Sequence, residues 1–369
     1  MNSLSNDVIH VHVVSSTAGS IGEITYDLLP ALHKNFFVTE DYYGDTPEKR
    51  DVLFMHFLNE SVMKQTESFN SFKKKILIQP VDGTVLTRDA VEMINRFDGV
   101  ITPAYAGKNI MLNNGVNTPI YVIPNFYKPD MLKKEVYSDV EKHIPSDKII
   151  FYHESTFHPR KGIELLYEGF IRAFSNMFWH DQVALVLKDI PFNARTFMQN
   201  EKWKKQAIKL QRSLKYSPQI IKYSTFLDDT ELKALWGRAD VYVSLAKLEG
   251  FGIPMLRMHL LNKPIICLRN ENSGYMDYLN DTNAYLIDSF PIKAEEEFMW
   301  LYEDKTEWNV PLMSDVIETF EKVARDIKVD KQKRLRRETP EHVDMVYKKY
   351  SLEQVANQYV SIIKDIWFE

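Results

Sequence analysis

The sequence predicts an α/β protein with two doubly wound domains, each built around a parallel sheet. Short apolar segments alternate with helical patterns along most of the 369 residues, which is typical of parallel strands joined by covering helices. The chain is long enough to form two cores of ordinary size. In addition, two glycine-containing loops, at 15–22 and 249–254, each connect a predicted strand to a predicted helix, as in nucleotide-binding α/β domains.

The first domain is expected over residues 1–144. The alternating segment Val8-Ile-His-Val-His-Val-Val14 predicts its first strand, and apolar residues over 24–32 recur at helical spacing. Further strands are predicted at 51–55, 75–78, 99–101 and 119–123, with a helix at 104–112. Because strands and helices alternate, the sheet should be parallel with both faces covered.

The second domain is expected over residues 145–350. Its predicted strands lie at 149–152, 239–245, 263–268 and 284–287, and its predicted helices at 163–174 and 226–236. We interpret 188–222 and 290–313 as local elaborations, the latter as an arm or a lid. Residues 351–369 predict a final helix, because Ser351 and Gln354 form a capping pair ahead of apolar residues at helical spacing.

The densest motif is the loop Glu249-Gly-Phe-Gly-Ile-Pro254. Pro254 suits the first turn of a helix, because its φ is already set and its missing N–H is not needed there. Gly250 and Gly252 let the backbone approach a ligand, and the N–H groups at a helix start favour a negatively charged oxygen. The motif predicts a phosphate site beside Glu249, with an ordinary tight turn as the alternative.

A second candidate anion site lies at His158-Pro-Arg-Lys-Gly162, directly before the predicted helix 163–174. Arg160 and Lys161 stand just ahead of that helix start, and cations there strengthen the binding of an anion. The alternative is a basic approach to a helix with no ligand.

In the order of its strands, loops and helices the chain resembles the GT-B glycosyltransferases, specifically the retaining family 4 type. The resemblance spans nearly the whole chain and rests on the 249–254 loop, the pair Lys161-Gly162 and the link Val122-Ile-Pro-Asn125. It implies two Rossmann-like domains that face a central cleft, with a C-terminal helix that crosses back to the first domain. It also implies transfer of a sugar from a nucleotide-diphosphate sugar to an acceptor hydroxyl, with retention. We expect no metal or other cofactor, because the cleft-forming loops lack an Asp-x-Asp motif and Lys161 with the helix starts can stabilise the leaving diphosphate.

The resemblance assigns roles to individual positions. Glu249 is expected to position the sugar ring, and Lys161 to hold the diphosphate with the neighbouring Arg160 as a weaker partner. Further donor-binding candidates are backbone positions: Gly19 and Gly22 in the first loop, and Gly250, Phe251, Gly252 and Ile253 in the second.

Two positions depart from the family pattern. Ser155 stands where an arginine is usual, and Arg257 replaces the second glutamate of the E-x7-E motif, which holds the ribose in the family. We hypothesise that Arg257 restores the missing positive charge toward the diphosphate or contacts the nucleotide. An exposed surface arginine is the alternative.

Polar residues that follow strands of the first domain are the candidates for the acceptor side. Asp82, in the turn Gln79-Pro-Val-Asp-Gly83, is expected either to orient the acceptor hydroxyl or to cap its own turn. His56 follows the second apolar segment, where a hydrogen-bonded turn histidine is more usual than a catalytic one.

The acceptor itself is left open by the sequence. Hydroxymethylated bases of DNA are one alternative, because the stretches 202–215 and 328–337 are rich in Lys and Arg, although solvated helix faces have the same composition. A non-catalytic module that binds sugar nucleotides is a further alternative, supported by the substitutions at Ser155 and Arg257.

Composition and charge limit the kinds of partner and the cellular location that we expect. The net charge of −5 argues against attraction of the whole molecule to nucleic acid or anionic lipid. We expect a cytoplasmic protein, since no apolar stretch reaches the length of a membrane span and the N-terminus lacks the layout of a signal peptide. The single cysteine, Cys267, lies in a predicted buried strand and suits a packing role.

Overall fold

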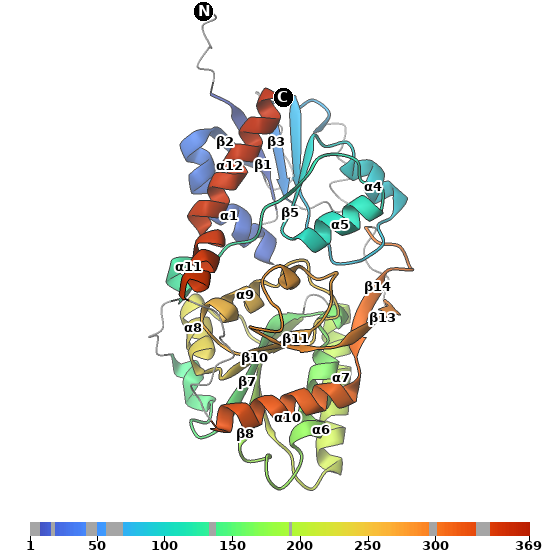
Figure 1. The fold of residues 1–369 in the computed structure, drawn as a ribbon, viewed down its shortest axis with the longest axis vertical. Coiled ribbons are helices and arrows are strands. Elements are labelled where there is room, and N and C mark those ends of the chain that lie inside the picture. The colour runs from blue at the N-terminus through green and yellow to red at the C-terminus, as the bar shows by residue number, and fades with distance from the viewer. Residues whose placement is uncertain are drawn as a thin grey trace, which may run out of the picture.

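The computed structural model describes residues 8–15, 19–41, 50–56, 69–132, 138–191, 194–294, 301–329 and 340–369. These residues form two lobes, and each lobe is built on a six-stranded sheet (Figure 1). Every strand pair within the two sheets is parallel. The predicted α/β class with two parallel sheets is therefore confirmed.

The sheet of the first lobe has the order β2-β1-β3-β4-β5-β6. Its strands are β1 (His10–Val14), β2 (Phe37–Asp41), β3 (Val52–His56), β4 (Lys74–Ile78), β5 (Gly99–Thr102) and β6 (Ile120–Val122), and its helices are α1 (Gly19–Asn35), α4 (Arg88–Ile94) and α5 (Tyr105–Asn113). All residues of β3 and β5 are buried, because central strands of a parallel sheet are covered on both faces. The edge strand β2 was not among the predicted strands.

The sheet of the second lobe has the order β12-β11-β10-β7-β8-β9. Its strands are β7 (Ile149–Phe157), β8 (Val183–Pro191), β9 (Gln219–Tyr223), β10 (Val241–Ser244), β11 (Ile265–Leu268) and β12 (Tyr285–Ile287). Its helices are α6 (Ile163–Phe174), α7 (Ala194–Ser213), α8 (Asp229–Arg238), α9 (Ile253–Leu260) and α10 (Met313–Val329). The interpretation of 188–222 as an elaboration is wrong, because β8 and β9 are two of the six strands of the sheet and α7 connects them.

The chain returns to the first lobe at its end, as predicted. After α11 (Pro340–Lys349), the helix α12 (Leu352–Phe368) begins at Ser351, whose side chain accepts a hydrogen bond from the N–H of Gln354. Its apolar face, including Val355, Tyr359 and Ile363, is buried in the same core as β1, β3 and α1. The predicted domain boundaries, after residues 144 and 350, stay a prediction.

The segment predicted as an arm or a lid contains a hairpin that reaches from the second lobe to the first. Strands β13 (Ser289–Lys293) and β14 (Glu307–Pro311) pair antiparallel, and they lie beside the second sheet below the first lobe (Figure 1). Leu301 and Tyr302 are buried in the core of the first lobe with Leu77, Val81 and Leu86. The hairpin therefore connects the lobes through packed side chains. Glu295 to Glu297 lie outside the described residues.

Among the described residues, no helix has both the length and the apolar composition that crossing a membrane requires.

Candidate active site

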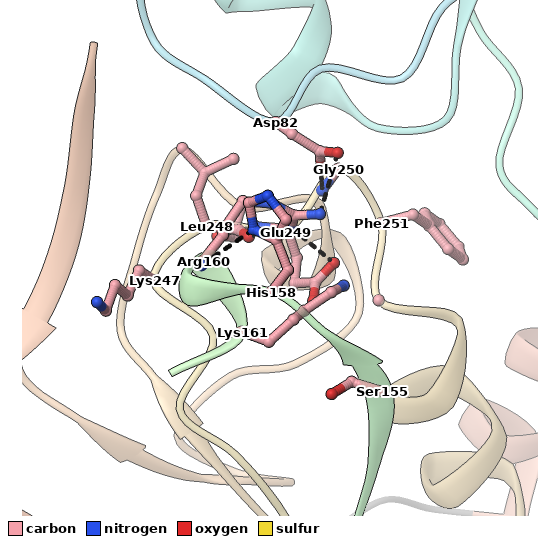
Figure 2. A network of polar contacts seen from close by, with 12 residues as sticks. Asp82, Ser155, His158, Arg160, Lys161, Lys247, Leu248, Glu249, Gly250 and Phe251 are labelled. Atoms are coloured by element: carbon pink, nitrogen blue, oxygen red, sulfur yellow. Dashed lines mark hydrogen bonds and ion pairs between the residues drawn. The ribbon is translucent and has the colours of Figure 1, made fainter. Parts of the chain in front are cut away.

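Three segments meet where the two lobes face each other (Figure 2). They are the loop 245–252 after β10, the turn 158–162 after β7, and the turn around Asp82 after β4. All three follow the carboxyl ends of parallel strands, which is the edge of the sheet where α/β proteins bind ligands.

The turn after β7 is fixed in a conformation that requires glycine. Pro159–Lys161 form a single 3₁₀ turn, and Gly162 then adopts φ of 63° before α6 begins. A Cβ on Gly162 would lie 2.1 Å from the carbonyl oxygen of Leu245. The N–H of Lys247 also donates to the carbonyl of Arg160 at 2.7 Å, so the turn and the loop after β10 are held directly against each other.

Four charged side chains form one network in this position. The Glu249 carboxylate lies between Lys161, at 2.5 Å, and Arg160, at 3.3 Å. Arg160 also contacts the carboxylate of Asp82 from the first lobe at 3.1 Å. The other oxygen of Asp82 accepts a hydrogen bond from the N–H of Gly250 at 2.9 Å. Asp82 thus contacts the glycine loop of the other lobe, which the expectation of a turn cap did not anticipate.

The surroundings of the network favour the charged forms of Glu249 and Arg160, whereas they disfavour the charged form of Lys161. Burial opposes ionisation of Glu249, but Lys161 and Arg160 outweigh it and the pKa of Glu249 lies below its ordinary value. Burial lowers the pKa of Lys161, against the attraction of Glu249. Burial, together with Arg160, lowers the pKa of His158 to about 3. His158 is therefore neutral at pH 7, and its Nδ1 accepts a hydrogen bond from the N–H of Arg160.

Hydrogen bonds hold the peptide groups of the glycine loop from several sides. Arg160 donates to the carbonyl of Leu248 at 2.5 Å, and the N–H of Glu249 donates to the Ser273 hydroxyl at 3.1 Å. The Tyr278 hydroxyl contacts the carbonyls of Phe251 and Gly252 at 2.9 and 2.7 Å. The loop is therefore positioned before any ligand arrives, which reduces the cost of binding.

The helix α9 begins at Ile253, directly after Gly252, whose φ is 83°. The ring of Phe251 turns away from the charged network (Figure 2) and packs 5.4 Å from Tyr278 and 6.1 Å from Tyr350. Only the backbone of Phe251 is thus available to a ligand at this loop.

Arg257 lies in a separate cluster with Glu154, which the sequence reasoning did not single out. The guanidinium contacts the Glu154 carboxylate at 3.4 Å and lies 4.9 Å above the Trp236 ring. Glu154 also accepts hydrogen bonds from the Tyr152 hydroxyl at 2.6 Å and the Trp236 indole N–H at 2.7 Å. The nearly buried Glu154 therefore has a partner for each oxygen. In the sequence, Glu154 could have been noticed as an acidic residue just after the apolar predicted strand 149–152.

The first glycine loop is shorter than predicted. Helix α1 begins at Gly19, so Gly22 lies inside its first turn rather than at its start; residues 16–18 lie outside the described residues. Nearby, the buried hydroxyls of Ser15 and Thr25 lie 2.8 Å apart, and the Thr25 hydroxyl lies 2.6 Å from His56 Nδ1. Burial lowers the pKa of His56 to about 3, so His56 is a neutral residue inside the lobe.

Two further residues support the site although no motif identified them. The Tyr302 hydroxyl, from the hairpin segment, accepts a hydrogen bond from the N–H of Asp82 at 2.6 Å. Lys247 is buried, lies 2.7 Å from Glu164 and lies 5.4 Å from the Trp308 ring. Lys247 points away from the charged network (Figure 2), so it connects the loop to α6 and to the hairpin.

Metal-binding groups are not found in the described parts of the chain, where no three His, Cys, Asp or Glu side chains gather closely enough to hold an ion. Cys267 is buried in β11, and burial raises the pKa of its thiol. The thiol therefore has the properties of a small apolar side chain.

Comparison with solved structures supports the architecture. A glycosyltransferase from Rickettsia africae is 12% identical, with a TM-score of 0.68, over 98% of this chain and 99% of that one. HepE of Anabaena, solved in complex with UDP and glucose, is 13% identical, with a TM-score of 0.68, over 97% and 99%. A UDP-forming trehalose-phosphate synthase from Burkholderia xenovorans is 10% identical, with a TM-score of 0.69, over 97% and 99%. At these identities the likeness establishes the GT-B fold.

Comparison with sequences gives the family. No curated protein sequence matches the chain. However, the family described as glycosyl transferases group 1 matches residues 137–322, just over half of the chain and nearly the whole second lobe. Together with the fold, this match shows that the chain belongs to the glycosyl transferases group 1 family and is a glycosyltransferase.

Proposed function

We propose that this enzyme transfers a sugar from a nucleotide-diphosphate donor to an acceptor hydroxyl, as a retaining, metal-independent transferase of the family 4 type. HepE of Anabaena was solved with UDP and with UDP-glucose, which supports a nucleotide sugar as the donor. The observation that carries the proposal is the convergence of Arg160, Lys161 and Glu249 on the glycine loop at the carboxyl edge of the second sheet.

The chemistry of the leaving group explains why such a network is useful. When the bond between sugar and diphosphate breaks, negative charge grows on the phosphate oxygens, and preorganised donors stabilise that charge most effectively. Lys161 and Arg160 would supply positive charge, and the N–H groups of Gly250 and Gly252 would supply hydrogen bonds. The buried Nε of Arg160 has no hydrogen-bond partner among the described residues, so a phosphate oxygen would satisfy a donor that is otherwise unpaired.

Glu249 is assigned to the sugar ring. Its pKa is lowered, so it is a carboxylate at neutral pH and accepts hydrogen bonds from sugar hydroxyls. Asp82 faces the same loop from the first lobe. We assign it to orient the acceptor hydroxyl once the donor has taken its place at Gly250.

Arg257 is assigned a more limited part than the sequence suggested. Its guanidinium is held by Glu154 and Trp236, and 15% of its side chain stays exposed. A contact with the nucleotide would come from that exposed edge, while the diphosphate is left to Arg160 and Lys161.

Incubation of the pure protein with a panel of nucleotide sugars, without acceptor, tests the proposal. We expect slow release of nucleoside diphosphate from one donor, in the presence of EDTA as in its absence. Lys161→Ala should lower that rate by about 10²-fold or more, the scale of losing one preorganised charge donor. Lys293→Ala, which removes an exposed lysine on β13, should leave it unchanged.

Two outcomes would contradict the proposal. Donor binding without any turnover, with or without candidate acceptors, would favour a non-catalytic module. Turnover that survives Lys161→Ala and Glu249→Gln at the wild-type rate would place the chemistry elsewhere in the molecule.

A further inference from the structure

The outer ridge of α7 presents a regular row of positive charge, which we call the α7 stripe. The stripe consists of Lys202, Lys205, Lys209 and Arg212 on α7, and Lys215 just after the helix ends. All five side chains are exposed. We propose that the α7 stripe binds the phosphate backbone of duplex DNA.

The spacing of the stripe puts its cations on one side of the helix. The four helical members follow each other at intervals of three, four and three residues, and residues three or four apart share a helix face. The opposite face, with Trp203, Ala207, Leu210 and Leu214, packs into the core of the second lobe. The stripe is therefore the surface of α7 that faces solvent, on the outside of the second lobe beside α6 (Figure 1).

The charge of this surface is opposite to that of the molecule. Residues 201–215 contain six Lys or Arg and one Glu, a net charge of +5, whereas the whole chain has a net charge of −5. Lys204, which lies off the stripe, contacts Glu201 at 3.6 Å. Throughout the described residues, no carboxylate forms an ion pair with any of the five stripe side chains. Lys202 and Lys215 do lie 5.9 and 5.1 Å from the rings of Trp203 and Tyr216, but an aromatic ring does not neutralise a charge. Like charges that no carboxylate neutralises repel one another, and a polyanion relieves that repulsion.

The length of the stripe suits a polymer of phosphates. At a rise of about 1.5 Å per residue, the distance from Lys202 to Arg212 along the helix is about 15 Å. One strand of B-DNA places a phosphate about every 3.4 Å of helix axis, and the two strands together place one about every 1.7 Å. Each strand also winds around the axis, so a straight stripe faces phosphates of both strands across a groove. Long, flexible Lys and Arg side chains can reach these phosphates.

A bilayer fits this surface less well than DNA does. A helix that lies on a membrane buries an apolar face between the lipid headgroups. In α7 the apolar face is already buried against α6 and β7 in the lobe. The remaining surface is mostly charged, with Met198 and Ile208 as its exposed large apolar side chains. Two such side chains make no continuous apolar face to insert, which favours a hydrated phosphate backbone.

The stripe lies near the proposed active site without being part of it. Helix α7 follows β8, whose carboxyl end is at the same sheet edge as the glycine loop, and it runs away from that edge. DNA held along the stripe would therefore extend toward the space between the lobes. The inference goes beyond the proposed function, because it concerns binding of backbone phosphates and not the transfer of sugar. DNA binding is measured without any sugar donor, so either proposal can fail alone.

Fluorescence anisotropy with a labelled 30-base-pair duplex, at 50 to 300 mM NaCl, tests the inference on the full chain. We expect the logarithm of affinity to fall with the logarithm of salt concentration with a slope of about −3 to −4.5, because each contacted phosphate contributes about −0.9. The triple variant Lys205→Ala/Lys209→Ala/Arg212→Ala should reduce the slope by about 2.7 for the same reason.

The matched control removes three exposed lysines elsewhere, in Lys34→Ala/Lys293→Ala/Lys305→Ala, and should keep the wild-type slope. Circular dichroism and donor hydrolysis confirm that both triple variants are folded. An equal loss in the two triple variants would overturn the inference, as would an unchanged slope in the stripe variant. Stripe-dependent binding to vesicles of phosphatidylserine and phosphatidylcholine, with no binding to DNA, would also overturn it.

Discussion

At the scale of single residues, the charge of Arg257 is compensated from another element. The structure places the Glu154 carboxylate, 103 residues earlier in the chain, beside the Arg257 guanidinium. Either residue alone would destabilise the fold in this position, because burying a charge without an opposite charge beside it costs free energy. The two residues therefore form a unit, and a change at one depends on the other.

The residue pair leads to a prediction on stability. Arg257→Met should lower the free energy of unfolding by about 2 to 4 kcal/mol, because it leaves the nearly buried Glu154 carboxylate without its cation. The double variant Arg257→Met/Glu154→Gln should recover most of that loss. Urea denaturation followed by circular dichroism measures both. Arg325→Met, which breaks an exposed pair with Glu321, is the control and should cost less than about 1 kcal/mol. Equal losses in the single and the double variant would show that the charges are not coupled.

At the scale of elements, the site depends on short connections between strands and helices. The turn between β7 and α6 is only five residues long and places Arg160 and Lys161 next to the loop after β10. Gly162 makes this contact possible, because it supplies positive φ and leaves room for the carbonyl of Leu245. The chemistry of the site thus rests on the absence of one side chain.

Gly162→Ala should therefore damage both stability and activity. Gly115→Ala is a matched control, since Gly115 also has positive φ, 89°, but nothing lies within 4 Å of the position of its Cβ. The control should lose about 1 to 2 kcal/mol from backbone strain alone, and Gly162→Ala should lose more because of the contact at 2.1 Å. Thermal unfolding and donor hydrolysis measure the two effects. Equal stability losses, with hydrolysis retained in both variants, would contradict the assigned role of Gly162.

At the scale of the whole molecule, polar contacts hold the lobes together. Asp82 contacts Gly250 and Arg160, and Asp277 of the second lobe accepts a hydrogen bond from the N–H of Tyr105 at the start of α5. With Asp82 included, the network has two positive and two negative side chains, so its formal charge is zero. The Asp82 carboxylate accepts the hydrogen bond of the Gly250 N–H, which we assign to the binding of the nucleotide sugar.

This balance predicts competition between Asp82 and the donor. Asp82→Ala should increase the affinity for a nucleoside diphosphate by about tenfold, equivalent to about 1.4 kcal/mol, because it frees the N–H of Gly250 and removes a negative charge. Asp89→Ala removes the same charge from the exposed face of α4 and should leave affinity unchanged. Isothermal titration calorimetry distinguishes the two. Weaker binding to the Asp82 variant would show that Asp82 supports the donor instead.

Local sequence by itself determined much of the strand and helix pattern of this protein, the glycine loop at 249–254 and the basic turn at 158–162. These features follow from local rules, namely the period of apolar residues, the fixed φ of Pro254 and the freedom of glycine. The same rules missed β2, an edge strand, and the region of β8, α7 and β9, where the cations of α7 obscure the helical pattern.

Only the tertiary structure decided which charges meet. Asp82 and Gly250 are 168 residues apart, and Asp82 and Tyr302 are 220 apart. No local pattern encodes such pairs, because they arise when two separate sheets and a connecting hairpin pack against each other. Local patterns also did not predict the pairing of Arg257 on α9 with Glu154 on β7. The sequence supplied the chemical groups of the site, and packing decided which of them act together.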